Sequence, residues 1–401
     1  GQNGAKGFIP VARISDMLLH PGAPFSFNGQ SLVYPDVKLV YWAGGNPFHH
    51  QQDLTRLAEA FSRPDTIVVH EPYWTSSARH ADIVLPATIT LERDDIGAAG
   101  NDPKMIAMRK AIEPFQQSRD EYEIFAELAR RLGRHEAFTE GRTAREWMAF
   151  IYETTRTALA ERDLPAPDFE GFWAAGELDV PTSDRLSILE NFHRDPQGAP
   201  LPTPSGKIEI FSEVVAGFGY ADCAGHAAWF EPEDWLGGQI AERYPIQLVA
   251  NQPAFRLHSQ LDFGRASLGS KIRGREPLTI HPDTAKARGI VQGSVVRVFN
   301  DRGSFLAGAN ISGAIRPDVM QIATGAWYDP QDIVPFGTVC VHGNPNTVTR
   351  DRGTSSLGRC RSVRRATARV ALPPAATPRP LRRLSQRGGA TAGSVGVSFA
   401  A

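Results

Sequence analysis

Residues 44–52 concentrate groups that could hold a ligand directly after a short apolar run. The two glycines at the start of this segment allow the backbone to approach a bound molecule closely, and the Asn46 side chain can both donate and accept hydrogen bonds. His49 and His50 are adjacent, so their side chains point apart and seldom ligate one metal. Hydrogen bonding is therefore the favoured chemistry, with a plain strand–helix turn as the alternative.

Charged groups follow the next two apolar runs. His70 and Glu71 end the second run, and residues 92–95 (Glu-Arg-Asp-Asp) follow the third. Carboxylates at such positions suit ribose hydroxyls or the guanine edge that donates from N1 and N2, and the planar guanidinium of Arg93 could pair with a phosphate. A solvated run of charges at 92–95 is the alternative.

A third polar group lies in the second half of the chain, at residues 250–253 (Ala-Asn-Gln-Pro) and 256–260 (Arg-Leu-His-Ser-Gln). Residues 342–346 (His-Gly-Asn-Pro-Asn) are similar in character. This density of polar groups fits a ligand with several rings and phosphates, whereas a hydrated loop is the alternative. No serine nucleophile elbow, P-loop, His-Glu-x-x-His or Cys-x-x-Cys motif is present. The chemistry must therefore come from a bound cofactor.

Alternating strand and helix patterns position the first two groups. The predicted elements are three parallel strands, 37–42, 66–70 and 82–85, and two helices, 53–62 and 76–80. Ligands of such sheets bind beyond the carboxyl ends of the strands. We therefore expect the loops after the three strands, 43–50, 70–75 and 86–95, to share one edge. The side chains that should converge there are Asn46, His70, Glu71 and Arg93.

Two capping boxes predict helices further along the chain. Residues 118–121 (Ser-Arg-Asp-Glu) precede a helix that stops at Gly133, and residues 143–146 (Thr-Ala-Arg-Glu) open an amphipathic helix. Residues 161–205 are rich in Pro, Asp and Gly, which predicts a long irregular connection. The expected apolar face of the second helix consists of Trp147, Phe150 and Ile151.

Closely spaced strand patterns change the character of the chain after residue 240. The predicted strands are 246–250, 295–299, 305–311 and 319–324. Residues 300–303 (Asn-Asp-Arg-Gly) supply hairpin-turn residues between two of them. Together these features predict a small β-barrel over about residues 240–360.

Composition places the 401-residue chain among soluble globular proteins, because 41% of its residues are hydrophobic and 22% are charged. No apolar run reaches the roughly 18 residues of a membrane span, and three scattered cysteines are too few for a disulfide framework.

Residues 361–401 hold eight arginines and no acidic residue, which leaves residues 1–360 with a net charge of −9. We expect this basic tail to be disordered or aberrant; a nucleic-acid or membrane tether is the alternative.

Six segments carry a resemblance to a known family. They are WAGGNPFHHQQDLTRL (42–57), HEPYWTSSARHADIVLPATITLERDD (70–95), PTPSGKIEIFSE (202–213), ANQPAFRLHSQLDFG (250–264), GREPLTIHPDTAKARGI (274–290) and VRVFNDRGSFLAGA (296–309). These segments resemble the molybdopterin oxidoreductases, and within them the S- and N-oxide reductases, collinearly over about residues 1–360. The resemblance implies a parallel-sheet α/β domain followed by a C-terminal six-stranded β-barrel that binds the molybdopterin dinucleotide.

The implied division of the chain is linear. Residues 1–145 would form the C-terminal portion of the α/β oxidoreductase domain, residues 146–240 a helical and irregular connection, and residues 241–360 the dinucleotide-binding barrel. Residues 361–401 would remain as the basic tail.

The resemblance also implies a bis(molybdopterin guanine dinucleotide) molybdenum centre. Such a centre reduces S-oxides or N-oxides, here with a substrate like biotin sulfoxide, by oxygen-atom transfer at the metal. The residues that match contacts to one dinucleotide are Asn46, His50, His70, Glu71, Arg93 and Asp120. Those that match the stretch holding the pterins are Ala250, Asn251, Gln252, Pro253, Arg256, His258, Ser259 and Gln260, with Asn346 as a further contact.

Two departures from the family pattern affect what is expected. The molybdenum-ligating serine and the substrate-facing aromatics belong to an N-terminal half that these residues do not match, so no catalytic or metal-ligating residue is assigned. After residues 351–355 the family continues into a Gly-Gln contact and a last strand, whereas Cys360 leads here into the basic tail, as a frameshift would produce. We therefore expect the C-terminal half of such a reductase, inactive alone.

Other functions and partners follow from the same patterns. A non-catalytic remnant with residual nucleotide binding is the alternative function, and a nicotinamide dehydrogenase is disfavoured because no Gly-x-Gly-x-x-Gly opens a helix after a strand. The expected partners are a small S- or N-oxide and an electron donor of unknown identity, with no nucleic acid and no membrane span, in a protein that is monomeric at full length. The resemblance favours a cytoplasmic over a periplasmic location.

Overall fold

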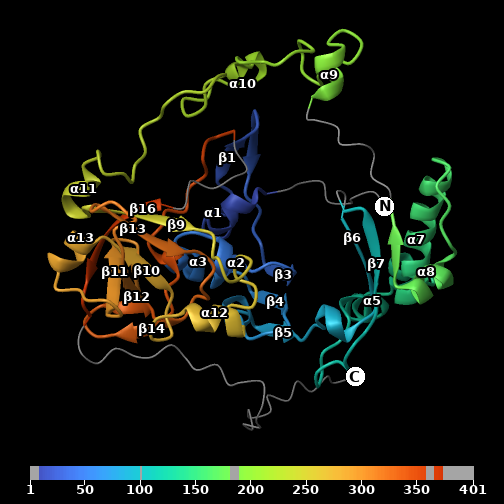
Figure 1. Cartoon of the computed structure of the whole chain (residues 1–401), viewed down its shortest axis with the longest axis horizontal. Coiled ribbons are helices and arrows are strands. Elements are labelled where there is room, and N and C mark those ends of the chain that lie inside the picture. Colours follow the sequence, from blue (N-terminus) through green and yellow to red (C-terminus); the bar gives the residue numbers. More distant parts are fainter. Residues whose placement is uncertain (1–8, 100–101, 181–188, 358–364, 374–401) are drawn as a thin grey trace. The chain divides into compact units, whose positions relative to one another are not determined.

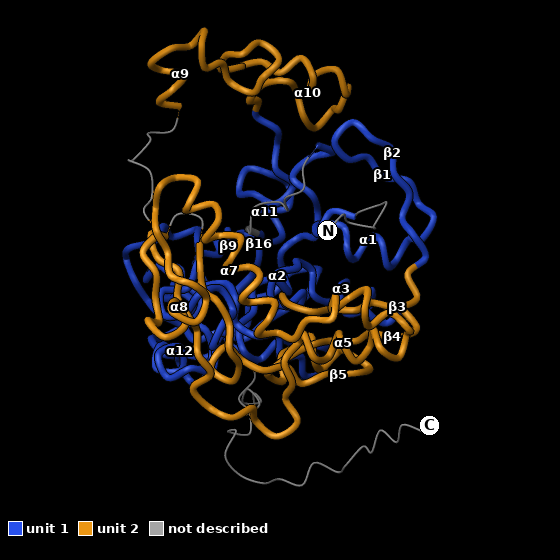
Figure 2. The backbone as a smooth tube through the Cα atoms, turned by 90° about the vertical axis from the view of Figure 1, so that its right-hand side faces the viewer, with its two compact units in different colours: residues 1–36, 46–63, 229–401 blue, residues 37–45, 64–228 orange. Residues whose placement is uncertain are grey.

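The computed structural model describes residues 9–99, 102–180, 189–357 and 365–373. The chain divides into two compact units, which are described separately below (Figure 2). Unit 1 comprises residues 1–36, 46–63 and 229–401, and unit 2 comprises residues 37–45 and 64–228. Unit 1 holds a closed β-barrel and unit 2 a parallel sheet with helices, which confirms the predicted fold class (Figure 1).

The parallel sheet of unit 2 consists of β3 (Leu39–Ala43), β4 (Thr66–His70) and β5 (Ile83–Leu85), in that order. Its central strand β4 buries Ile67 and Val69, which accounts for the apolar run in the sequence. Ala43 pairs with His70, and His70 with Leu85, so the three carboxyl ends lie level at one edge. The predicted strands and their parallel direction are confirmed.

A second, antiparallel sheet in unit 2 is absent from the sequence-based expectation. Its strands are β6 (Asp95–Ala98), β7 (Lys104–Met108) and β8 (Glu177–Asp179). The hydrophobic cluster against it includes Met105, Met148, Tyr152, Phe169 and Phe172. The prediction of an irregular connection over 161–205 is therefore wrong in part, because helix α8 (Phe169–Ala175) and strand β8 lie within it. The remaining short elements of unit 2 are α4 (Ser76–Arg79), η2 (Thr90–Glu92), α9 (Glu190–Arg194) and α10 (Glu213–Gly217).

The longer helices of unit 2 follow the two predicted capping boxes. They are α5 (Glu121–Arg131), α6 (His135–Thr139) and α7 (Ala144–Ala160). The N-cap of α5 is Asp120, whose carboxylate accepts from the Tyr122 N–H, rather than the predicted Ser118. Thr143 and Glu146 form the predicted capping box of α7.

The buried face of α7 differs from the predicted one. Met148, Tyr152 and Leu159 are buried, whereas Phe150 and Ile151 are about half exposed. The guanidinium of Arg142 lies 4.6 Å from the ring centroid of Trp147 and of Phe150, so a cation–π contact covers these rings without a core. The predicted buried face of α7 was therefore wrong, because Trp147 and Phe150 pack against the Arg142 guanidinium instead of the core.

The barrel of unit 1 closes through six strands. They are β9 (Ile246–Asn251), β10 (Pro277–Ile280), β11 (Val295–Asn300), β12 (Gly303–Ile311), β13 (Val319–Ala323) and β16 (Arg365–Ala371). The order β10-β13-β9-β16-β11-β12 returns to β10 through a parallel pairing with β12. Strands β15 (Gly337–Cys340) and β14 (Pro330–Ile333) extend from β12. The six-stranded barrel is confirmed (Figure 1).

Alternating apolar side chains fill the barrel interior. Fully buried examples, each at most 1% exposed, are Ile246, Leu248, Leu278, Ile280, Val296 and Val298. Each such side chain contributes about 1.5–3 kcal/mol when it leaves water. Asn300 pairs directly with Gly303, which confirms the predicted hairpin turn between β11 and β12.

Strand β16 corrects the expectation for the basic tail. Residues 365–371 are not irregular: they pair with both β9 and β11 and close the barrel. Ala366, Ala368 and Val370 are buried and alternate with other residues, which is the period of a strand. The eight arginines of residues 361–401 dominated the composition and hid this pattern. The other tail residues, 361–364 and 374–401, lie outside the described residues.

The remaining elements of unit 1 are short. They are η1 (Val11–Arg13), α1 (Ile14–Leu19), β1 (Pro24–Phe27), β2 (Gln30–Val33), α2 (Pro47–His50), α3 (Leu54–Phe61), α11 (Ile240–Arg243), α12 (Arg265–Ser270), α13 (Pro282–Lys286) and η3 (Pro345–Thr347). Asp53 caps the predicted helix α3 by accepting from the Arg56 N–H. Within the described parts of the chain, no helix has the length and apolar character needed to cross a bilayer.

Candidate functional site

His70 ends strand β4 and is held by two partners within unit 2. The Tyr41 hydroxyl lies 2.7 Å from Nε2, and Glu121 Oε1 lies 3.2 Å from Nδ1. Burial and the nearby Glu121 carboxylate raise the pKa of the Tyr41 phenol, so this group is a proton donor. Nε2 of His70 then accepts, and Nδ1 carries the proton that it donates to Glu121. The imidazole, which is fully buried, therefore joins β3, β4 and the first turn of α5.

Glu71 follows His70 beyond the carboxyl end of β4. The Thr75 hydroxyl donates to its Oε2 at 2.9 Å. Burial raises the pKa of Glu71 to about 7, although the hydrogen bonds from Thr75 and from the Tyr73 backbone act in the opposite direction. This carboxyl group is thus poised between its neutral and charged forms near neutral pH, and a ligand that donates to it favours the charged form.

Arg93 lies beside Asp120 in the same unit. Its Nε is 4.0 Å from an Asp120 oxygen, and its two Nη atoms donate to the Thr88 carbonyl at 3.1 Å and to Asp95 at 3.3 Å. The guanidinium remains about a quarter exposed. The buried hydroxyl of Thr88 has no hydrogen-bond partner among the described residues. Because Asp120 precedes Glu121, the partner of His70, both Arg93 and His70 meet the start of α5.

Loop 251–264 follows strand β9 in unit 1 and carries the predicted pterin contacts. His258 has a positive φ of 50°, and its carbonyl region lies against Gly325, where a Cβ would come within 2.1 Å of the His258 oxygen. The indole N–H of Trp327 donates to the Ser259 carbonyl at 2.8 Å. Ser259 is buried, whereas His258 and Gln260 are exposed. Contacts with Gly325 and Trp327 therefore fix the backbone of this loop, while the side chains of His258 and Gln260 are exposed.

Two buried asparagines hold helix α2 in unit 1. Asn346 is fully buried, and its amide donates to the His49 carbonyl at 3.1 Å. Asn344 donates to the Phe48 carbonyl at 3.3 Å. These bonds hold helix α2, whose last residue His50 lies edge-on to His258 at 6.0 Å between ring centroids. The structure thus brings His50 to loop 251–264 and places Asn346 against α2.

The remaining predicted residues lie at the ends of these segments. Asn46 is buried at the start of α2. Ala250 and Asn251 are the last residues of β9, where loop 251–264 begins, and Gln252 and Pro253 follow them. Asn46 belongs to unit 1, whereas the predicted partners in the parallel sheet belong to unit 2. The convergence of Asn46 with that group therefore stays a prediction.

Sequence reasoning missed the buried charges that support loop 251–264. Arg256, a predicted contact, is buried together with Asp262, Lys271 and Glu276. It also missed Tyr41, which positions His70. Charged residues close to a polar loop were the available signal, but only the fold shows which of them are buried together.

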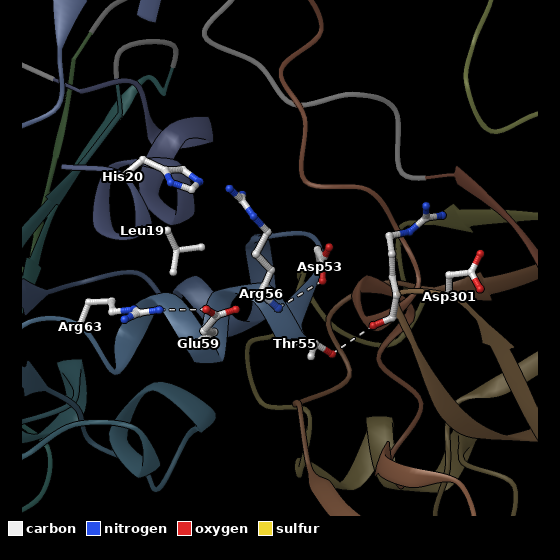
Figure 3. A pocket seen from close by; sticks show the side chains of 9 residues that line it. Leu19, His20, Asp53, Thr55, Arg56, Glu59, Arg63 and Asp301 are labelled. Atoms are coloured by element: carbon white, nitrogen blue, oxygen red, sulfur yellow. Dashed lines mark hydrogen bonds and ion pairs between the residues drawn. The ribbon is translucent and has the colours of Figure 1, made fainter. Parts of the chain in front are cut away.

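A hollow of about 500 Å³ in unit 1 has no predicted site residue in its lining (Figure 3). Arg56 in its wall pairs with Asp16 and Asp351, and Arg63 pairs with Glu59. Figure 3 shows Arg56 and Glu59 on α3 together with Arg63, His20 and Asp301. The arginines of this wall are paired with carboxylates. The hollow lies where α1, α3 and the β11–β12 turn meet, and we assign it no ligand.

The two units together define a class of protein: a parallel α/β sheet with charged groups at its carboxyl edge, and a closed barrel with a polar loop after β9. Residues 16–131 match the family model of the molybdopterin oxidoreductases, and residues 246–367 match that of the molydopterin dinucleotide binding domain. The chain belongs to the molybdopterin oxidoreductase family.

Named relatives are reductases of S- and N-oxides. A dimethyl sulfoxide/trimethylamine N-oxide reductase of Cereibacter sphaeroides is 45% identical over 88% of this chain and 43% of its own length. A biotin sulfoxide reductase of the same organism is 44% identical over 90% of this chain and 48% of its own length. A trimethylamine-N-oxide reductase of Haemophilus influenzae is 44% identical over 88% of this chain and 44% of its own. The chain thus spans less than half the length of these relatives.

A solved structure agrees with the fold. Acetylene hydratase from Pelobacter acetylenicus superimposes with a TM-score of 0.67 over 91% of this chain and 47% of its own. The two sequences are 20% identical over the match, so this likeness concerns the fold alone.

Proposed function

We propose that this chain supplies the cofactor-binding domains of a molybdenum-dependent reductase of S-oxides or N-oxides. The observation that carries the proposal is the identity of 44–45% with dimethyl sulfoxide, trimethylamine N-oxide and biotin sulfoxide reductases over about nine-tenths of the chain. The cofactor that fits is a bis(molybdopterin guanine dinucleotide) molybdenum centre, which when bound supplies two-electron oxygen-atom transfer.

The residues of unit 2 suit the nucleotide end of such a cofactor. Glu71 can accept from the N1 and N2 donors of guanine once it is ionised, and the exposed part of the Arg93 guanidinium can pair with a phosphate. The unpartnered Thr88 hydroxyl adds a donor and an acceptor beside Arg93, within the described part of the chain. His70 and Asp120 serve by fixing this group, since their polar atoms are bonded within the protein.

The residues of unit 1 suit the pterin end. Asn251, Gln252, His258 and Gln260 are exposed side chains that can exchange hydrogen bonds with a pterin edge. The Asn346 amide is already bonded to a carbonyl of α2, so we assign it the role of holding His50 in place. Neither unit offers an evident nucleophile within its described residues, and the protein's part is binding and orientation.

Nucleotide titration of the 401-residue chain tests the proposal directly. We expect guanosine diphosphate to bind with a measurable heat and cytidine diphosphate to bind at least about tenfold more weakly, as expected when one recognised edge is lost. Substitution Arg93→Gln should weaken both nucleotides, because it removes the phosphate partner. Equal binding of both nucleotides would show that the base is not recognised and would refute the guanine form, and binding of neither would refute the cofactor assignment.

The finer expectations on partners stay part of this proposal. We propose that the oxide substrate is like biotin sulfoxide, that the electron donor is a separate protein or small molecule, and that the location is cytoplasmic. Reduction assays with biotin sulfoxide and trimethylamine N-oxide, on this chain co-expressed with a matching N-terminal half, distinguish the two kinds of substrate.

A further inference from the structure

Five ionisable side chains are buried together beneath loop 251–264 in unit 1. They are Arg256, Asp262, Lys271, Glu276 and His342, each with a side chain at most 4% exposed. They come from the loop itself, from the end of α12, from the start of β10 and from the segment after β15. Charged groups are seldom buried unless they are paired, so this cluster is a built feature.

Asp262 is the centre of the cluster. Its Oδ1 accepts from Lys271 Nζ at 2.7 Å and from the Ser267 hydroxyl at 3.1 Å, and its Oδ2 accepts from the Trp327 backbone N–H at 3.1 Å. Nδ1 of His342 lies 3.5 Å from Oδ2. Burial alone would raise the pKa of Asp262, but His342, Lys271 and Arg256 outweigh it and hold the pKa well below its usual range. The carboxylate is therefore charged near neutral pH.

Arg256 links this centre to the backbone of the loop. Its Nε donates to the His258 carbonyl at 3.1 Å, and one Nη donates to the Thr324 carbonyl at 2.8 Å. The other Nη donates to Glu276 and to Ser267, both at 3.3 Å. The donors of the guanidinium are thus directed at the protein. The resemblance matches Arg256 to a cofactor contact, but the geometry gives it a different task.

The loop backbone needs such support. His258 and Leu261 both have positive φ values, 50° and 49°, in a region that non-glycine residues seldom occupy. Leu257 and Leu261 are both 64% exposed, so the loop has little apolar burial of its own. The Trp327 indole donates to the Ser259 carbonyl, and Arg256 donates to the preceding His258 carbonyl. The backbone N–H of Trp327 in turn donates to Asp262. These bonds fix the backbone from which the neighbouring side chains project.

We propose that Arg256 and Asp262 are positioning residues, which hold loop 251–264 in the conformation that presents His258 and Gln260 to a pterin. The proposal rests on the proposed function for the identity of the ligand, but the ordering of the loop is independent of it. Replacing a buried ion pair by apolar groups is often neutral or stabilising. A cluster of this size is therefore better explained by the geometry it imposes than by stability.

Amide hydrogen exchange of the full 401-residue chain measures the ordering directly. Arg256→Lys keeps the positive charge but cannot reach the His258 and Thr324 carbonyls at once. Asp262→Asn removes the negative charge and turns an amide donor toward either the Trp327 N–H or the Lys271 ammonium. We expect each variant to speed exchange of residues 256–262 at least about tenfold, since a hydrogen bond to a charged group is lost. Binding of pterin-6-carboxylate, followed by its fluorescence, should weaken in parallel.

Val298→Ala is the matched control, because it truncates a fully buried side chain of β11 and leaves the cluster intact. It should lower the melting temperature without changing exchange at 256–262 or pterin affinity. Arg256→Lys retains charge balance, so it decides the matter even where Asp262→Asn does not fold. Unchanged loop exchange in Arg256→Lys, or an equal change in Val298→Ala, would overturn the positioning role. Failure of the wild-type chain to bind the pterin would count against the proposed function, while the exchange comparison still decides the role of the cluster.

Discussion

Substitution of Glu71 by Gln tests the environment at the carboxyl edge of the parallel sheet. Burial raises the pKa of this carboxyl group from its ordinary 4.5 to about 7 in the folded protein. The folded chain therefore holds the proton more tightly than the unfolded chain. The resulting stabilisation is fully present below pH 4.5 and is lost as the pH rises through 7.

The magnitude follows from the size of the shift. One pKa unit corresponds to about 1.4 kcal/mol, so the free energy of unfolding should fall by about 3 kcal/mol from this group between pH 4.5 and pH 7.5. The glutamine side chain of the Glu71→Gln variant has no such dependence, and its amide oxygen can still accept from the Thr75 hydroxyl. The variant should therefore gain about 3 kcal/mol on the wild type over this range.

Two measurements check this expectation. Urea unfolding at pH 4.5 and pH 7.5 gives the difference between Glu71→Gln and wild type, with Glu123→Gln as the control because Glu123 is an exposed residue of α5. Carbon-13 NMR of the glutamate carboxyls, with the Glu71 signal assigned from the variant, gives the pKa itself. A Glu71 titration below pH 5.5, or a stability difference that does not change with pH, would refute the reasoning.

Three further substitutions test other parts of the structure. Gly325→Ala places a Cβ about 2.1 Å from the His258 carbonyl oxygen, so we expect a lower melting temperature and faster amide exchange of loop 251–264. Ala368→Asp puts a charge inside the closed barrel at β16 and should abolish folding of unit 1 in circular dichroism, whereas Arg369→Asp, at an exposed position of the same strand, should be tolerated. Asn346→Ala removes a buried hydrogen bond to α2 and should cost about 1–3 kcal/mol in urea unfolding; an unchanged midpoint would show that α2 is held by other contacts.

The parallel sheet could be predicted because its signals are local. Residues 66–70 form a continuous apolar run that must be buried on both faces, and the glycines at 44–45 end the preceding strand where the backbone takes positive φ values of 80° and 76°. The carboxyl ends of parallel strands meet at one edge as a matter of geometry. The placement of His70 and Glu71 at the carboxyl end of β4 needed no knowledge of distant contacts. The convergence of Arg93 with them stays a prediction.

The antiparallel sheet and the last barrel strand could not be predicted, for two different reasons. Strand β8 pairs with β7, which lies about 70 residues earlier in the chain, and no turn signal connects them. Strand β16 fills its interior positions with small residues such as Ala366 and Ala368, which fit a strand only where barrel curvature leaves little room. The sequence indicated disorder there because residues 361–401 hold eight arginines and no acidic residue and are rich in Ala, Pro, Gly and Ser.

The polar residues of the candidate site were found as a set, but their individual tasks depend on the fold. His70, Arg256 and Asn346 all match ligand contacts by sequence, yet each directs its polar atoms at the protein: His70 at Tyr41 and Glu121, Arg256 at the loop carbonyls, and Asn346 at α2. The side chains left to meet a ligand are those that these residues hold in place. Alanine substitution of either kind would weaken cofactor binding, so affinity alone cannot separate contact from support. Conservative variants with loop exchange as a second readout can, because only a supporting residue changes the order of the loop before any ligand is present.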